Sequence, residues 1–164
     1  MTRSSALTEL STTLWREREL LELLLFKLEE EQLLLAAGKA RWLGHATREV
    51  EVVLEEIRRA ELARAVEVDA VAAELGLPSG CSLRQLADAA PAPWGDVLRE
   101  HRAAFLSVSQ EVSALAEANR DLLTAGVRAA RSALDSLSEP DAATYTPDGQ
   151  AARTTRPLLL DRTG

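Results

Sequence analysis

The chain has 164 residues, 46% of them hydrophobic but only 4% aromatic, and the hydrophobic residues are mainly Leu and Ala, which favour helices. Eight glycines and six prolines are few for a protein of many strands and tight turns, which argues against sandwiches, barrels and nucleotide-binding α/β sheets. The formal net charge is −7, and none of the successive parts 1–37, 38–75, 76–137 and 138–164 has a basic excess, which disfavours partners such as nucleic acid or an anionic membrane.

A first helix is predicted over residues 5–37, ending before Gly38, because glycine suits the left-handed position after a helix. Leucines recur in it every seven residues, which indicates a coiled-coil seam, although Glu17 and Glu31 interrupt this seam. Further apolar residues near Phe26 lie outside the seam, so the helix is expected to contact more than one neighbour. The seam consists of Leu7, Leu14, Leu21, Leu28 and Leu35.

A break is predicted over residues 39–45, which include Trp42-Leu43-Gly44, and a second helix is predicted over residues 46–75. Glu61 and Arg64 fall midway in the apolar pattern of this second helix. Its expected inner face consists of Val50, Leu54, Ile57, Val68, Val71 and Leu75.

A loop is predicted over residues 76–81, which are rich in glycine, proline and serine. Ser82 followed by Gln85 predicts a capping box for a short helix over residues 83–89. Pro91-Ala92-Pro93 ends this helix and begins the next, because proline suits the first turn of a helix.

The last helix is predicted over residues 93–137, and at about 1.5 Å per residue it would be roughly 65 Å long. Apolar residues recur along it at alternating steps of three and four, and Asn119 occupies one of these core positions. Asn119 has two open interpretations, a polar residue satisfied by water or a residue that fixes the register of the helices. The pattern predicts an all-α fold, an elongated antiparallel bundle or coiled coil of three long helices plus the short one.

A second apolar stripe lies beside the main seam near the end of the last helix, where the seam itself thins to Gly126, Ala129 and Ala133. One interpretation is drift of a 3.6-residue helix against a 3.5-residue repeat. The other is a trough that receives an amphipathic helix of another protein. The residues predicted to bind that helix are Leu115, Leu122, Leu123, Val127, Leu134 and Leu137.

Residues 138–164 have no helical periodicity and are rich in polar residues, proline and glycine, which predicts a flexible tail. The tail has one apolar cluster, Leu158-Leu159-Leu160, and the only tyrosine of the chain, Tyr145. Tyr145 is interpreted either as an incidental aromatic residue or as the anchor of a short binding motif.

No pattern in the sequence predicts a catalytic, metal or cofactor site, and an enzyme is not expected. His45 and His101 lie in different elements without a metal-binding motif, and His101 falls on a helix seam, where a packed imidazole is the simpler interpretation. Cys81 is the only cysteine, which excludes an intramolecular disulfide and fits a reducing cytoplasm. The most apolar run, Leu20 to Leu28, contains charges and is too short for membrane insertion.

The order of several short segments resembles that of FlgN-type flagellar export chaperones of high-GC Gram-positive bacteria, over roughly residues 8–149. The segments are Leu14-Trp15-Arg16-Glu17, Leu33-Leu34-Leu35-Ala36-Ala37-Gly38, Ala60-Glu61-Leu62-Ala63-Arg64, Gly76-Leu77-Pro78, Ser82-Leu83-Arg84-Gln85-Leu86-Ala87, Glu117-Ala118-Asn119-Arg120-Asp121-Leu122-Leu123 and Thr144-Tyr145-Thr146-Pro147-Asp148-Gly149.

The resemblance implies a cytosolic, non-enzymatic chaperone that binds hook-associated proteins of the hook–filament junction and delivers them to the flagellar type III export gate and its ATPase. It also implies a client surface toward the last helix and a role for Tyr145 in docking at the gate. Two other functions stay open as alternatives to an export chaperone. One is a small secreted helical hairpin with a W-x-G turn, which Trp42-Leu43-Gly44 would form, and the other is a structural coiled-coil adaptor. Whether the first helix also forms a homodimer stays open.

Overall fold

The computed structural model describes residues 3–138, and it contains four helices in the order α1 (Arg3–Ala36), α2 (Ala40–Leu75), α3 (Leu83–Ala89) and α4 (Trp94–Ser138). No strand occurs within these residues, so the all-α prediction is confirmed. The predicted flexible tail, residues 138–164, lies outside the described residues except for Ser138, which is the last residue of α4. The chain forms two compact units, Met1–Thr124 and Ala125–Gly164, which are taken separately below.

The turn between α1 and α2 is shorter than the predicted break over residues 39–45, and α2 begins at Ala40 rather than at residue 46. Gly38 adopts a left-handed conformation with φ of 65°. The amide of Gly38 donates to the carbonyl of Leu35 at 3.1 Å and that of Lys39 donates to the carbonyl of Leu34 at 2.9 Å. This pair of bonds closes a helix end within two residues, so Trp42-Leu43-Gly44 belongs to α2 and forms no turn.

The loop between α2 and α3 also begins with a left-handed glycine, and it ends with a capping box. Gly76, with φ of 73°, and Leu77 donate their amides back to α2, which ends that helix. At the start of α3 the Ser82 hydroxyl accepts from the Gln85 amide at 3.3 Å, while the Gln85 side chain accepts from the Ser82 amide at 2.8 Å. The predicted capping box is therefore confirmed.

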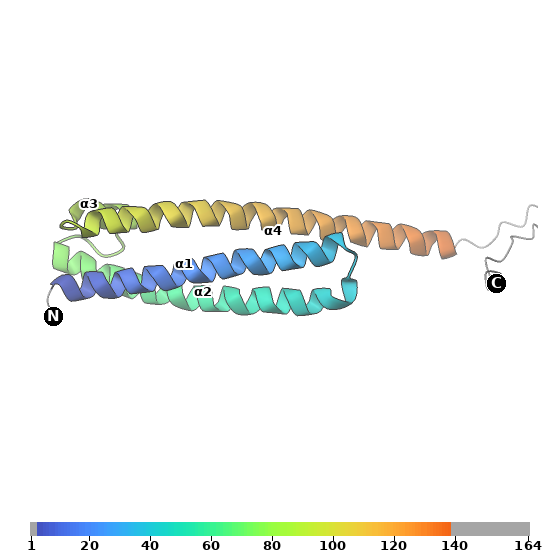
Figure 1. The fold of residues 1–164 in the computed structure, drawn as a ribbon, viewed down its shortest axis with the longest axis horizontal. Helices are drawn as coiled ribbons and strands as arrows, with labels where there is room; N and C mark the ends of the chain where they lie inside the picture. Colours follow the sequence, from blue (N-terminus) through green and yellow to red (C-terminus); the bar gives the residue numbers. More distant parts are fainter. Residues whose placement is uncertain (1–2, 139–164) are drawn as a thin grey trace, which may run out of the picture. The chain divides into compact units, whose positions relative to one another are not determined.

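Helices α1 and α2 form an antiparallel hairpin in the first unit (Figure 1). Residues at similar distances before and after Gly38 face each other across the two helices. Side chains bond between them along most of their length. The bonded pairs are Thr13 with Glu67, Glu17 with Arg64, Lys27 with Glu49 and Glu31 with Thr47.

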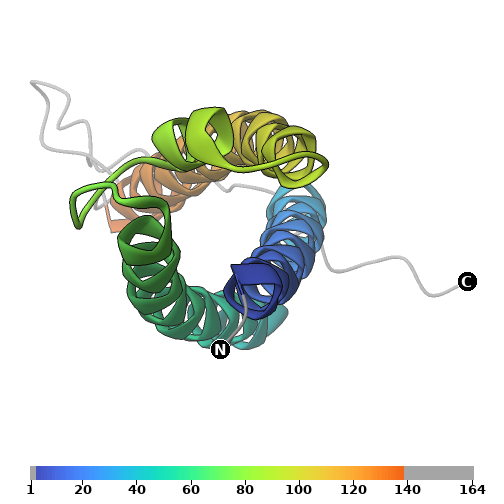
Figure 2. The ribbon, with the colours of Figure 1, turned by 90° about the vertical axis from the view of Figure 1, so that its left-hand side faces the viewer.

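The core of the first unit consists of two apolar clusters where α1, α2 and the part of α4 before residue 125 surround a common centre (Figure 2). The first cluster also includes α3, and it consists of Leu7, Leu10, Leu14, Val71, Ala72, Cys81, Leu86, Ala87 and Leu98. The second consists of Leu24, Leu28, Val50, Val53 and Ile57, with Val112, Leu115 and Ala116 of α4 packed against it. Leu7 and Leu14 of the predicted leucine seam lie in the first cluster, and Leu28 lies in the second, with Leu21 packed against it.

The described part of the second unit is the last stretch of α4, residues 125–138. Every side chain described there, from residue 125 to residue 137, is exposed. Apolar residues are nevertheless frequent in this stretch.

Candidate interaction surface

Three of the predicted binding residues lie in the second unit, on one face of α4. Val127, Leu134 and Leu137 are 44%, 62% and 82% exposed. Together with Ala130 they are spaced at steps of three and four residues, which places them along a single stripe of the helix. The second unit therefore presents a row of apolar side chains to the surroundings.

Two further predicted residues, Leu122 and Leu123, lie in the first unit and are 38% and 46% exposed. Leu123 lines a shallow groove of about 240 Å³ together with Leu28 and Leu35 of α1 and Leu43 of α2. The groove is mostly apolar in its lining, so Leu123 contributes to a surface that three helices build.

Leu115 is placed differently from the other predicted residues. It is only partly exposed and packs against the second core cluster, near Leu24, Leu28 and Val53. Its side chain is used by the core of the first unit rather than by an exposed face.

Asn119 is 5% exposed, and its side chain links α4 to α1. Its Nδ2 donates to the Leu28 carbonyl at 2.9 Å and to Glu31 Oε2 at 3.1 Å. The other oxygen of Glu31 accepts from the Thr47 hydroxyl of α2 at 2.8 Å. One polar residue in each of three helices thus takes part in a single linkage, which favours the register-fixing interpretation of Asn119.

Glu17, the other interruption of the leucine seam, is 3% exposed and lies between the two core clusters. Its Oε1 accepts from Arg64 Nη1 at 2.9 Å, and its Oε2 has no hydrogen-bond partner among the described residues. Burial raises the pKa of Glu17, the nearby Arg64 charge acts against this rise, and Glu61 adds to it. Burying the Glu17 carboxylate therefore carries a desolvation penalty, and the attraction to Arg64 only partly offsets this penalty.

His101 is 2% exposed and packs between two aromatic rings of the same region. The Trp15 ring meets it edge-on with centroids 5.2 Å apart, and the Phe105 ring is stacked at 6.4 Å. Burial lowers the pKa of His101, Arg18 lowers it further, and Glu100 acts in the opposite direction. This is the packed imidazole that the sequence indicated.

The pairing of Glu17 with Arg64 was not predicted from the sequence, although both residues stood out as charges in apolar patterns. A signal for it exists. In a hairpin that turns at Gly38, two such charges at comparable distances from the turn face each other. Opposite charges in facing core positions then predict an ion pair.

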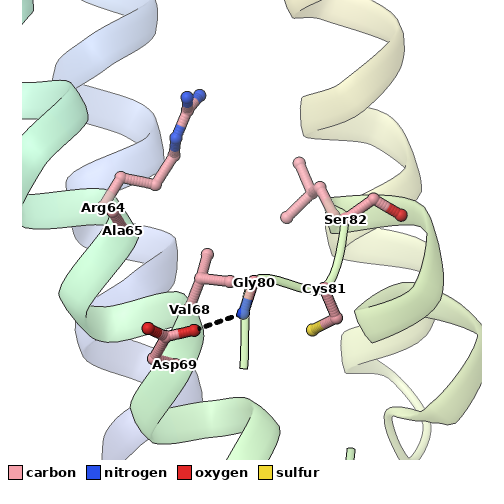
Figure 3. Close-up of a pocket in the computed structure, with 8 residues that line it drawn as sticks. Arg64, Ala65, Val68, Asp69, Gly80, Cys81 and Ser82 are labelled. Atoms are coloured by element: carbon pink, nitrogen blue, oxygen red, sulfur yellow. Dashed lines mark hydrogen bonds between the residues drawn. The ribbon is translucent and has the colours of Figure 1, made fainter. Parts of the chain in front are cut away.

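Cys81 lies beside a hollow of about 350 Å³ between α2 and the loop before α3 (Figure 3). The Asp69 carboxylate accepts a hydrogen bond from the Gly80 amide at 2.7 Å, which holds this loop against α2. The Cys81 thiol is buried in the first core cluster, and no histidine lines the hollow. The surroundings are those of a structural cysteine rather than of a nucleophile.

Within residues 3–138 no group of three or more His, Cys, Asp or Glu side chains is arranged to hold a metal ion. None of the helices in that range is both long enough and apolar enough to span a bilayer.

Comparison with known proteins identifies the family to which this helical protein belongs. A model of the FlgN protein family matches residues 1–153, which is nearly the whole chain. The chain belongs to the FlgN family. No curated protein and no solved structure gives a significant match.

FlgN proteins are chaperones of flagellum biogenesis that bind hook-associated proteins, and the family is not one of enzymes. The family resemblance seen in the sequence is thereby confirmed. Tyr145 lies within the matched residues but outside those that the structure describes. Residues 154–164, with the Leu158-Leu159-Leu160 cluster, lie beyond the family match.

Proposed function

We propose that this FlgN protein binds hook-associated proteins in the cytoplasm, prevents their premature assembly, and delivers them to the flagellar export gate and its ATPase. The observation that carries the proposal is the apolar stripe of Val127, Leu134 and Leu137, which is exposed although the apolar residues of α4 near Val112 are packed in a core. Family membership supports the export role.

The proposed mechanism needs no chemical step. An apolar helix face of a hook-associated protein would associate early if it stayed exposed to water. Packing that face on the stripe of Val127 and Leu137 hides it from water. Leu122 and Leu123, in the first unit, are proposed as separate contacts to the client. Because the surface is narrow and binding is non-covalent, the client can be handed over at the gate.

Binding is tested with a purified hook-associated protein and a variant carrying Val127→Asp and Leu137→Asp. Each aspartate would place a charge in an apolar contact, and we expect the dissociation constant to rise at least about tenfold. Leu106→Asp is the control, because Leu106 is a leucine of α4 outside the stripe and its exposure, 49%, is close to the 44% of Val127. Unchanged affinity in the double variant with unchanged circular dichroism would contradict the client surface.

Docking at the export gate is tested separately at Tyr145. Tyr145→Ala is expected to reduce secretion of the client by about tenfold or more while client binding in solution is unchanged. Tyr145→Phe, which keeps the ring, shows whether the hydroxyl contributes. If the alanine variant secretes the client normally, Tyr145 has no part in docking.

A further inference from the structure

The outward face of α1, in the first unit, carries a row of exposed residues. Alternating steps of four and three residues connect its members, which places them on one side of the helix. Every member is exposed, whereas Leu24 and Leu28 on the opposite side belong to the second core cluster. This outer row consists of Trp15, Glu19, Glu22, Phe26, Glu29 and Leu33.

Three members of the outer row are large and apolar. Trp15, Phe26 and Leu33 are 50%, 52% and 70% exposed, and the exposed Leu23 lies beside them. Single exposed apolar residues are common on protein surfaces. These residues instead recur along one side of the helix over a length of about 27 Å. An aligned set of this kind indicates a surface that another molecule covers.

The outer row meets a hollow at its Leu33 end. The hollow has a volume of about 390 Å³ and lies between α1 and α2. Leu33 and Leu34 of α1 and Trp42 of α2 are the large apolar residues of its lining. The volume lies in the range of pockets that bind ligands, so the hollow can receive a large apolar side chain.

The charges around this hollow balance one another. The carboxylates of Glu30 and Glu49 both bond the ammonium group of Lys27, at 2.8 Å each. Arg41 and His45 both lie against the tryptophan ring of the lining, the guanidinium at 4.9 Å and the imidazole at 5.8 Å. Two carboxylates are thus accompanied by two permanent cations and by one imidazole that lines the hollow. The hollow therefore selects for an apolar group and not for a charge.

The charged members of the outer row, by contrast, are all acidic. Its three glutamates are exposed and form no ion pair within residues 3–138. Among the bases beside the row, Lys27 bonds two other carboxylates and Arg18 lies over the Trp15 ring at 4.4 Å. Arg16 is the remaining base of this part of α1, so one positive charge accompanies three negative charges. The outer row therefore suits a surface that is both apolar and basic.

A second copy of this chain is a poor match for the outer row. If two rows met in parallel, each glutamate would face the same glutamate of the other copy. If they met antiparallel with Trp15 opposite Leu33, Glu19 of one copy would face Glu29 of the other. Like charges that face each other in an interface are unfavourable in both arrangements. The charges therefore favour a different protein as the occupant.

We propose that the outer row binds an amphipathic helix of another protein, with the apolar side of that helix against Trp15, Phe26 and Leu33 and its lysines or arginines beside the three glutamates. An apolar side chain at one end of the bound helix enters the hollow at Leu33. The outer row belongs to the first unit, whereas the stripe of Val127 and Leu137 belongs to the second. The proposal goes beyond the chaperone function and does not depend on it.

A model peptide tests the polarity and charge of this surface in the full-length protein. The peptide is a labelled helix of about 20 residues, long enough to cover the outer row, with leucines at heptad spacing and lysines elsewhere. The control peptide has glutamates in place of the lysines. Fluorescence anisotropy should show that the glutamate peptide binds at least about tenfold more weakly. Equal affinities for the two peptides, or no binding of the lysine peptide, would overturn the proposal.

The apolar members are tested with the lysine peptide and a variant that carries Phe26→Ser and Leu33→Ser. The matched control carries Leu62→Ser and Val66→Ser, which remove two exposed apolar side chains of α2. Neither pair of substitutions alters the net charge. We expect the dissociation constant to rise at least about tenfold in the first variant and to stay unchanged in the control. Equal values in both variants, with unchanged circular dichroism, would overturn the proposal.

The acidic members are tested by Glu22→Gln with Glu29→Gln, compared with Glu51→Gln and Glu117→Gln at exposed positions outside the row. Both variants lose two negative charges, so general attraction between a basic peptide and an acidic protein changes equally. We expect about threefold weaker binding in the first variant alone, at low ionic strength. An equal loss in both would overturn the charge match.

Light scattering of the protein without peptide identifies the alternative occupant. A monomer is expected, and a dimer that Phe26→Ser and Leu33→Ser dissociate would overturn the proposal in favour of a second copy. All of these variants keep Val127 and Leu137, so the client surface can fail its own test while the outer row passes, and the reverse.

Discussion

The leucine seam of α1 is interrupted twice, at Glu17 and at Glu31, and the two interruptions differ in how the fold satisfies them. Glu17 is almost completely buried, has one bond to Arg64, and leaves its second oxygen without a partner among the described residues. Glu31 is only partly buried, and both of its oxygens accept hydrogen bonds, one from Thr47 and one from Asn119. The first is an ion pair between two helices, and the second connects three.

This difference indicates distinct roles for the two glutamates. A buried carboxylate with one partner is weak support for stability, because desolvation offsets most of the attraction. A carboxylate with both oxygens bonded fixes the relative position of the helices at lower cost. We therefore expect the Glu31 linkage to set how α4 aligns with α1, and the Glu17 pair to contribute less to the free energy of unfolding.

The largest effect is expected from Asn119→Asp. The change replaces a donor by a carboxylate within about hydrogen-bond distance of Glu31 Oε2 and of the Leu28 carbonyl. We expect the free energy of unfolding to fall by about 3 kcal/mol, because a buried carboxylate at residue 119 then faces the carboxylate of the partly buried Glu31. Urea unfolding followed by circular dichroism measures it. Asn119→Leu is the control, and a loss as large in that variant would show that repulsion is not the cause.

Arg64→Met comes next, because it leaves Glu17 buried without its partner. Methionine keeps an aliphatic side chain but removes the guanidinium that lies over the Phe105 ring. We expect a loss of about 2 kcal/mol, since Glu17 can respond by taking up a proton. Combining it with Glu17→Leu should restore most of the stability. If the double variant is no more stable than Arg64→Met alone, the attraction between Glu17 and Arg64 stabilises the fold by more than the desolvation of the two charges destabilises it.

These two linkages also separate what the sequence could predict from what it could not. The heptad leucines, Gly38 and the Ser82 capping box have strong local preferences, and they predicted the helices and two of the turns. The break at residues 39–45 was wrong because the left-handed glycine turn needs so few residues, and Trp42 and Gly44 were taken for part of it. The partner of Asn119 depends on contacts between helices that no local pattern specifies. The Glu17–Arg64 pair follows only once the position of the hairpin turn is known.

The exposed stripe could be predicted only in part for the same reason. Val127 and Leu137 were placed correctly on an apolar face, since helical spacing alone decides it. Leu115 instead lies on the main seam of α4, beside the stripe, and it packs against residues of α1 and α2. Periodicity identifies a face of a helix, and only the packing of the other helices shows where along the helix that face is used.

A smaller effect is expected from Thr47→Val, which removes one of the two bonds of Glu31 at an exposed position. The loss should be about 0.5 kcal/mol, because water can replace the hydroxyl. Thr12→Val is a matched control, since the Thr12 hydroxyl bonds only a carbonyl of its own helix. If Thr47→Val costs no more than the control, α2 does not contribute to the three-helix linkage.

The smallest effect concerns pH and separates Glu17 from its neighbour His101. Burial raises the pKa of Glu17 above 4.5, so its contribution to stability is largest below that pH and is lost as the pH rises through its folded pKa. Burial lowers the pKa of His101 below 6.5, so its contribution is present above that pH and is lost as the pH falls through its folded pKa.

Acidification from about pH 7.5 to about pH 5 should therefore stabilise the fold through Glu17 and destabilise it through His101. His101→Phe, which keeps an aromatic ring between Trp15 and Phe105, should lose less stability on acidification than the wild type. Glu17→Gln should lose more, because the gain from protonating Glu17 is gone. Urea midpoints measured across this pH range compare the three proteins. Parallel curves for all of them would mean that neither buried group titrates with a pKa altered by folding.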